Sequence, residues 1–324
     1  MARTNKNSEQ IAGRIYTHDL SIRTVENKQS ENYGKEFING TLDVATDDAG
    51  LNVIQVHYSY VTPTTKAGKG NASYNALKQI IESGKTVLKD GLDQATCVRL
   101  TPSIALNDFY PQGSDDLVTT PRHEGGFVTI LRSAAELPAE GQDRNKFECD
   151  VLITNVEHVE KNEERGIEED FVRLKGCVFN FRNDVLPMSF IVRHPAAMKY
   201  FEDAGIDASN PMYTGIRGYI ENRSVKTERH TESAFGEDAV DIVERHVRNW
   251  VVNHANKMPY DFGAEDVLTP ADIAKAMENR NVMLAEIKQR SVEYYANRNN
   301  SAAPAPAAAP STSVPGIPAG GFKF

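Results

Sequence analysis

The clearest pattern along the chain is a strand-like alternation of apolar and polar residues that returns in its second half. Residues 35–61 form two apolar-rich runs hinged at a polar turn, which is typical of a β-hairpin. Residues 173–195 carry a similar pair of runs. Gly40 and Gly176 occupy equivalent positions in the second strand of each half. We therefore interpret the chain as two copies of one β module.

The first module is predicted to contain five strands and one helix. The strands are expected at residues 11–25, in the two arms of 35–61, at 95–106 and at 125–133, with a helix at 71–83. In the first strand, Ile11 and Ile15 share a face and polar residues occupy the other, which is the pattern of a half-buried strand. Asn71 is a suitable N-cap for the helix.

The second module repeats that order of elements. Its strands are expected at residues 147–160, 171–181, 185–192, 214–225 and 239–252, with a helix at 195–205. Five strands with a helix between the third and the fourth is the order of the OB-fold, a small Greek-key barrel. The sequence therefore predicts a mainly β fold with helices, built from tandem OB-fold-like five-stranded barrels. An unrelated pair of α+β domains is the alternative.

The segment after the second module has two parts of different composition. Thr269 and Pro270 are suitable to begin a helix at residues 268–298. Its expected apolar stripe consists of Ile273, Met277, Leu284, Ile287 and Tyr294. Packing on the second barrel is the expected role of this helix, and self-association is the alternative. The Ala- and Pro-rich residues 299–324 cannot bury a core and are predicted to be a disordered tail.

The polar segment 135–146 is the predicted boundary between the two modules. We expect a first OB-like domain at residues 1–134, a second at 147–263, the C-terminal helix at 268–298 and the tail at 299–324.

Composition narrows the class of protein. The chain has 324 residues, is 40% hydrophobic and carries a formal charge of −9. This charge counts against a protein that coats nucleic acid by bulk electrostatics, but it does not exclude a local basic groove. Cys97, Cys149 and Cys177 form no C-x-x-C pair, which argues against a zinc ribbon and suits a reducing compartment. Because no secretory signal and no membrane-spanning run are visible, a cytoplasmic location is expected.

Motifs for catalysis are missing from the sequence. We find no H-E-x-x-H, no Walker A, no G-x-S-x-G and no dinucleotide-binding fingerprint. The acidic run at residues 157–170 lacks the ligand spacing of a calcium loop and is interpreted as a solvated hairpin tip. The sequence therefore predicts a protein that is not an enzyme and that needs neither a metal nor a cofactor.

Basic and aromatic residues alternate on the predicted outer faces of several strands. A flat ring beside a cation suits single-stranded nucleic acid, because the ring stacks on a base and the cation neutralises a phosphate. The loop at residues 66–70 adds lysines and glycines before a helix N-terminus. Phe179, Phe181 and Trp250 are assigned to the core. The candidate nucleic-acid-binding residues are Arg14, Tyr16, His18, Tyr58, Lys66, Lys69, Arg217, Tyr219, Arg223, Arg245 and Arg248.

The tandem OB-like halves, the Pro/Ala-rich tail and the closing peptide GFKF together resemble single-stranded DNA-binding proteins, particularly large phage-encoded ones. The resemblance implies sequence-tolerant binding of single-stranded DNA during replication, recombination or repair, in the host cytoplasm if the protein is phage-encoded. It also implies a tail that recruits partner proteins. The well-known bacterial tail is acidic, however, whereas Lys323 is the only charged side chain here.

Phe322, Lys323 and Phe324 form the expected partner-binding peptide, since exposed aromatic residues usually mark interaction sites. The alternative for the tail is that its phenylalanines fold back into the protein's own binding groove. For the whole protein, the alternative is a virion structural or assembly protein that uses OB-like interaction modules. A carbohydrate-binding module is disfavoured by the arginines at residues 217–248.

Overall fold

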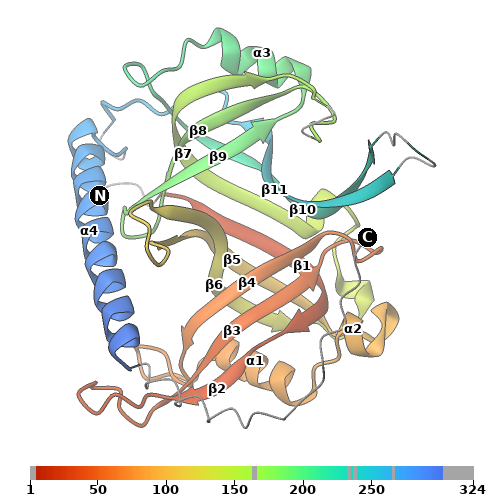
Figure 1. The fold of residues 1–324 in the computed structure, drawn as a ribbon, viewed down its shortest axis with the longest axis vertical. Helices are drawn as coiled ribbons and strands as arrows, with labels where there is room; N and C mark the ends of the chain where they lie inside the picture. Colours follow the sequence, from red (N-terminus) through yellow and green to blue (C-terminus); the bar gives the residue numbers. More distant parts are fainter. Residues whose placement is uncertain (1–4, 163–165, 232–234, 236–238, 265–266, 302–324) are drawn as a thin grey trace, which may run out of the picture.

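The structure is a computed structural model that describes residues 5–162, 166–231, 235, 239–264 and 267–301. Figure 1 shows two β-barrels, one above the other, with a long helix along one side of both. In the part of the chain so described, no helix combines the length and apolar composition that crossing a membrane requires.

The first barrel closes on itself. Its elements are β1 (Asn7–His18), β2 (Ser21–Thr24), β3 (Glu36–Ala45), β4 (Val53–Val61), α1 (Ala72–Ser83), α2 (Val87–Asp90), β5 (Cys97–Phe109) and β6 (Val118–Ile130). Strand β1 pairs with β3, β3 with β4, β4 in parallel with β6, β6 with β5, and β5 again with β1. This circuit, with α1 between the third and fourth barrel strands, is the OB-fold topology.

The second barrel repeats the same circuit. Its elements are β7 (Asn145–Val159), β8 (Phe171–Phe179), β9 (Val185–Val192), α3 (Pro195–Asp203), β10 (Met212–Thr231) and β11 (Ala239–Ala255). Strand β7 pairs with β8, β8 with β9, β9 in parallel with β11, β11 with β10, and β10 with β7. The prediction of tandem OB-fold barrels is confirmed.

The apolar residues of the alternating pattern form the interior of the barrels. Ile11 and Ile15 are fully buried, and Leu77 and Ile80 of α1 join the same core. Asn71 caps α1 as predicted, since its side chain accepts a hydrogen bond from the backbone of Ser73 at 3.1 Å.

The segment predicted as one strand at residues 11–25 is two strands, β1 and β2. The chain turns between them at Asp19, whose carboxylate accepts hydrogen bonds from the backbone and the hydroxyl of Thr41.

Both glycines of the sequence repeat lie where a Cβ atom would meet backbone, which at Gly40 would be the carbonyl oxygen of Asp19 at 2.7 Å. Gly40 has a φ of 125°, a left-handed conformation that other residues rarely adopt, and it lies at a register shift in the β3–β4 ladder. Gly176 approaches β7 so closely that a Cβ atom there would lie 2.1 Å from the carbonyl oxygen of Leu152. The equivalence in sequence therefore reflects tight barrel closure rather than one shared turn.

The barrels are joined through β1, which pairs with β7 from Asn7 to Ile11. Buried Glu9 lies at this junction, 2.7 Å from Nδ1 of His123 in the first barrel, and it accepts a 2.9 Å hydrogen bond from the indole N–H of Trp250 in the second. One continuous hydrophobic cluster runs through both barrels. The division into domains at residues 1–134 and 147–263 stays a prediction.

Helix α4 (Pro270–Ser301) begins as predicted. The hydroxyl of Thr269 accepts a hydrogen bond from the backbone of Asp272, and the carboxylate of Asp272 accepts one from the backbone of Thr269. The predicted stripe is partly wrong, because Met277 and Tyr294 are exposed while Ala276 and Arg280 take the buried positions.

Besides packing on the second barrel, α4 contacts the first. The guanidinium of Arg280 lies 3.0 Å from the Asp108 carboxylate, and Ser291 donates to the carbonyl oxygen of Tyr110. The predicted tail at residues 299–324 lies outside the described residues from 302 onward.

Candidate nucleic-acid interface

A groove of about 750 Å³ opens on the outer surface of the second barrel. Residues of β8 and β9 line one part of the groove, and mid-strand residues of β10 and β11 line another. The loop before β8 and two residues of β6, Thr119 and Pro121, complete it. In an OB-fold this is the strand 2–3 face together with the loop between strands 1 and 2, where ligands of such barrels bind.

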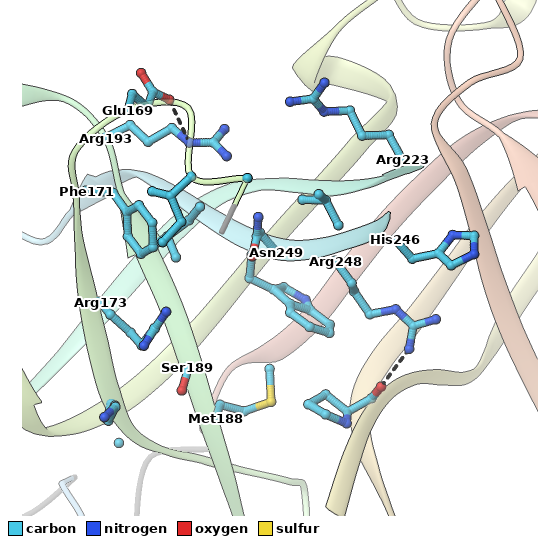
Figure 2. A pocket seen from close by; sticks show the side chains of 18 of the residues that line it. Glu169, Phe171, Arg173, Met188, Ser189, Arg193, Arg223, His246, Arg248 and Asn249 are labelled. Carbon is cyan, nitrogen blue, oxygen red and sulfur yellow. Dashed lines mark hydrogen bonds and ion pairs between the residues drawn. The ribbon is translucent and has the colours of Figure 1, made fainter. Parts of the chain in front are cut away.

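Five basic side chains, from β8, β10, β11 and the residue after β9, line the groove: Arg173, Lys175, Arg193, Arg223 and Arg248. Figure 2 labels the four arginines. Strand geometry places them there, because successive side chains point to opposite faces of a sheet. In β8, Val172 and Leu174 are fully buried in the core, so Arg173 and Lys175 project outward. The arginines have a fixed, planar array of donors that suits phosphate oxygens.

Glu221 holds two of these arginines in place. Its carboxylate lies 2.7 Å from a terminal nitrogen of Arg193 and 3.1 Å from Nε of Arg223, and it also accepts a hydrogen bond from Asn249. Burial alone would raise the pKa of Glu221, but the hydrogen bonds from Arg193 and Asn249 outweigh it and lower the pKa. Glu221 is therefore a charged positioning residue beneath the cations.

The loop before β8 supplies two more carboxylates, which are solvent-exposed. Glu169 lies 2.9 Å from Arg193, and Glu168 lies 3.3 Å from Arg223. Figure 2 shows Glu169 beside Arg193 at the rim of the groove. Exposed ion pairs of this kind are weak, so a stronger anion can replace these carboxylates.

Phe171 and Trp250 are aromatic residues that line the groove. The Phe171 ring is partly exposed, and the Arg173 guanidinium lies 5.5 Å from its centroid. Trp250 is held by its hydrogen bond to Glu9. Arg248 crosses to the first barrel and donates to the carbonyl oxygen of Pro121 at 3.2 Å, and burial lowers the pKa of its guanidinium.

The structure brings only two of the predicted binding residues into the groove, Arg223 and Arg248. Arg217 and Tyr219 lie nearby on β10 but do not line it, and the nearest carboxylate to Arg217 is Glu148, at 3.8 Å. The side chain of Arg245 lies outside the described residues, as do Phe322, Lys323 and Phe324.

The candidates on β1 lie away from the groove. Arg14 is largely buried and forms a 2.8 Å ion pair with Asp48, so it fastens the hairpin between β3 and β4. Tyr16 and His18 are partly buried, and burial lowers the pKa of His18. Lys66 and Lys69 are exposed in the loop before α1 and do not line the groove either.

Two assignments of aromatic residues were wrong. Tyr58, a predicted binding residue, is 1% exposed and belongs to the core of the first barrel, because its position on β4 faces inward with Ile54 and Val56. Phe181, predicted to be buried, is 78% exposed because β8 ends at Phe179 and the next residues turn outward. Phe179 and Trp250 are buried as expected.

Sequence reasoning missed Phe171, Arg173, Lys175 and Arg193 as groove residues. The signal for the first three was present, since Phe171, Arg173 and Lys175 alternate with buried residues at period two. Arg193 gave no such signal because it follows the last residue of β9.

Within the described ranges, no group of three or more His, Cys, Asp or Glu residues is arranged to hold a metal ion. The three cysteines are buried, and burial raises the pKa of Cys177 to about 12, so this thiol is unreactive.

The structure is thus a tandem OB-fold protein whose second barrel has a groove lined by basic side chains, Phe171 and Trp250. The chain matches the family model described as YorF over residues 6–290, and it therefore belongs to the YorF family. No curated protein sequence matches the chain.

Solved structures with similar folds include two of the single-stranded DNA binding protein from Thermus aquaticus. A deletion mutant is 12% identical with a TM-score of 0.46, covering 82% of this chain and 100% of its own. The wild-type protein is 10% identical with the same TM-score of 0.46, covering 80% and 96%. A replication protein A heterotrimer bound to single-stranded DNA is 10% identical with a TM-score of 0.22, covering 75% and 49%.

Proposed function

We propose that this protein binds single-stranded DNA without catalysis and with little dependence on base sequence. The observation that carries the proposal is the groove of the second barrel, which five cations and a partly exposed phenylalanine line on the face where OB-folds bind ligands. Phosphates supply the charge for the arginines, and unpaired bases supply flat surfaces for Phe171.

The charges in the groove favour a polyanion over a neutral ligand. Arg173 and Lys175 share the exposed carboxylate of Glu157, and Arg193 and Arg223 share Glu221. Without the exposed loop residues Glu168 and Glu169, the cations of the groove therefore outnumber the carboxylates that hold them. A DNA strand offers one phosphate for each nucleotide and displaces the weaker carboxylate partners. A neutral sugar chain carries no charge that could replace these carboxylates.

Titration with fluorescently labelled oligo-dT at two salt concentrations tests the proposal. The variant Arg173→Ala/Lys175→Ala should bind more weakly and with less salt dependence, because each lost phosphate contact lowers the slope of log affinity against log salt by about 0.7. Trp250 is the single tryptophan and lines the groove, so its fluorescence reports occupancy independently of the label.

The matched control is Lys199→Ala/Lys257→Ala, which removes two exposed lysines that do not line the groove. It should bind like the parent. If the two double variants bind equally well, or if oligo-dT leaves Trp250 fluorescence unchanged, the groove is not the binding site.

We extend the proposal to replication, recombination or repair, to a phage-encoded protein acting in the host cytoplasm, and to recruitment of partners by Phe322, Lys323 and Phe324. Deletion of residues 314–324 tests recruitment. Docking predicts unchanged strand affinity and loss of a co-purifying protein, whereas fold-back into the groove predicts tighter strand binding. The second candidate, a virion assembly protein, predicts no salt-dependent binding to oligo-dT.

A further inference from the structure

The first barrel carries a group of basic side chains that differ from those in the groove in their charge pairing. All five are exposed and come from β2, from the turn between β2 and β3, or from the loop after β4: Arg23, Lys28, Lys35, Lys66 and Lys69. None of the five has a carboxylate partner among the described residues. Arg23 donates only to the Ser21 hydroxyl, at 3.3 Å, and Lys35 to the Asn32 side chain, at 3.0 Å.

Two aromatic rings lie on the same face. Phe37 on β3 and Tyr60 on β4 have ring centroids 4.7 Å apart, and Tyr60 is 45% exposed. Arg23 is the cross-strand partner of Phe37, and paired residues in an antiparallel ladder project on the same side. The row Arg23, Phe37, Tyr60 therefore crosses three neighbouring strands on the outer face of the barrel.

The loop that carries Lys66 and Lys69 is held at the end of β4. The side chain of Asn71 donates to the carbonyl oxygen of Thr62 at 2.9 Å, and its backbone N–H donates to Pro63 at 2.8 Å. The base of the loop thus lies two residues beyond Tyr60. Arg23 on β2 is thus paired with Phe37, and the loop with Lys66 and Lys69 begins where β4 ends, just after Tyr60.

We propose that this surface, formed by Arg23, Lys35, Phe37, Tyr60, Lys66 and Lys69, is a second binding site for a single-stranded oligonucleotide. A base stacks on Tyr60 beside Phe37, and the neighbouring cations contact the flanking phosphates. The inference rests on the proposed function, because it assigns a further surface to the same ligand class.

Charge selects a strand over a protein partner for this surface. Exposed aromatics alone would suit a protein. Here, however, Phe37 is paired across the ladder with Arg23, which has no carboxylate partner in the described part of the chain. A stacking ring beside a cation is the combination that single-strand binding uses. Glu26 and Glu31 are exposed in the same turn, whereas Glu36 accepts a hydrogen bond from the Tyr74 hydroxyl. A second copy of the chain is the competing occupant.

The aromatic contact is tested by comparing Tyr60→Leu, which removes the π face, with Tyr60→Phe, which keeps it. Anisotropy of labelled oligo-dT should show about tenfold weaker binding for Tyr60→Leu and parent-like binding for Tyr60→Phe. The matched control is Tyr200→Leu, because Tyr200 is 41% exposed on α3 and packs against one ring. It should bind like the parent.

The same measurement in the Arg173→Ala/Lys175→Ala background separates this site from the groove. If Tyr60→Leu weakens the binding measured by anisotropy in both backgrounds, the second site is supported. This holds even if Trp250 fluorescence shows that the groove does not bind the strand. If only the groove variant loses affinity, the groove stands and the inference is overturned. Sedimentation of the parent and Tyr60→Leu completes the test: a dimer that Tyr60→Leu dissociates would assign the surface to a second copy and also overturn it.

Discussion

The two barrels share one topology but differ in whether their surface cations are paired with carboxylates. In the second barrel, Arg193 and Arg223 are held by Glu221 and covered by exposed carboxylates of the preceding loop. In the first, Lys66 and Lys69 are exposed without a carboxylate partner among the described residues. The shared strand order therefore determines where a ligand face would lie in each barrel. Individual residues determine whether the cations on that face are paired.

The difference has a consequence for binding. A cation without a partner attracts phosphate over a distance and gains its full interaction, whereas a paired cation must exchange one anion for another. Pre-positioned arginines in turn lose less side-chain freedom when they bind. We therefore expect the first barrel to dominate salt-dependent capture and the second to dominate the geometry of the bound strand.

The largest expected effect tests whether the barrels are independent at all. Glu9→Ala leaves His123 and the indole N–H of Trp250 without their buried acceptor, so the free energy of unfolding should fall by about 3 kcal/mol. Calorimetry should show one transition for both barrels in the parent. Glu9→Gln, which retains a hydrogen-bond acceptor, should lower the free energy of unfolding by less. Two separate transitions would support independent domains at residues 1–134 and 147–263.

A similar loss is expected where α4 ties the barrels together. Arg280→Ala leaves the Asp108 carboxylate, with a side chain only 4% exposed, without its guanidinium, and should lower the free energy of unfolding by about 3 kcal/mol. Lys288→Ala is the matched control on the same helix, because its ion pair with Asp115 is exposed. Urea denaturation should show little change for the control, and equal losses would contradict this role of Arg280.

A smaller effect should sharpen the contrast in charge pairing. Glu168→Gln/Glu169→Gln frees Arg223 and Arg193 from exposed partners, so oligo-dT affinity at low salt should rise about fivefold. Neutralising Glu82 and Glu278, which are exposed on other surfaces, controls for net charge. Equal gains in both variants would show that bulk charge, and not the ion pairs of the groove, limits binding.

The smallest effect concerns pH. The folded pKa of Glu221 is lower than its ordinary value of 4.5, so its stabilisation is present above pH 4.5 and is lost as pH falls through the folded pKa. Melting temperature should therefore decline less steeply below pH 4.5 in Glu221→Gln than in the parent. Parallel curves would mean that Glu221 is not responsible for this acid sensitivity.

Several elements followed directly from local sequence. Period-two alternation located β1, a pair of apolar-rich runs located β8 and β9, and the caps at Asn71 and Thr269 located the starts of α1 and α4. These signals are readable because they depend on neighbours within a few residues. Tyr58 shows the limit, since alternation placed it on a face with Ile54 and Val56 without showing that this face is the core.

The sequence by itself determined the order of the strands and hence the class of barrel, because burial of one strand face requires a pattern that is written locally. Only the tertiary structure decided which cations are paired and which are free. Arg193 and Glu221 are 28 residues apart, and Arg223 and Glu168 are 55 apart. Barrel closure brings such partners within hydrogen-bonding distance, and no local pattern in the chain records that closure.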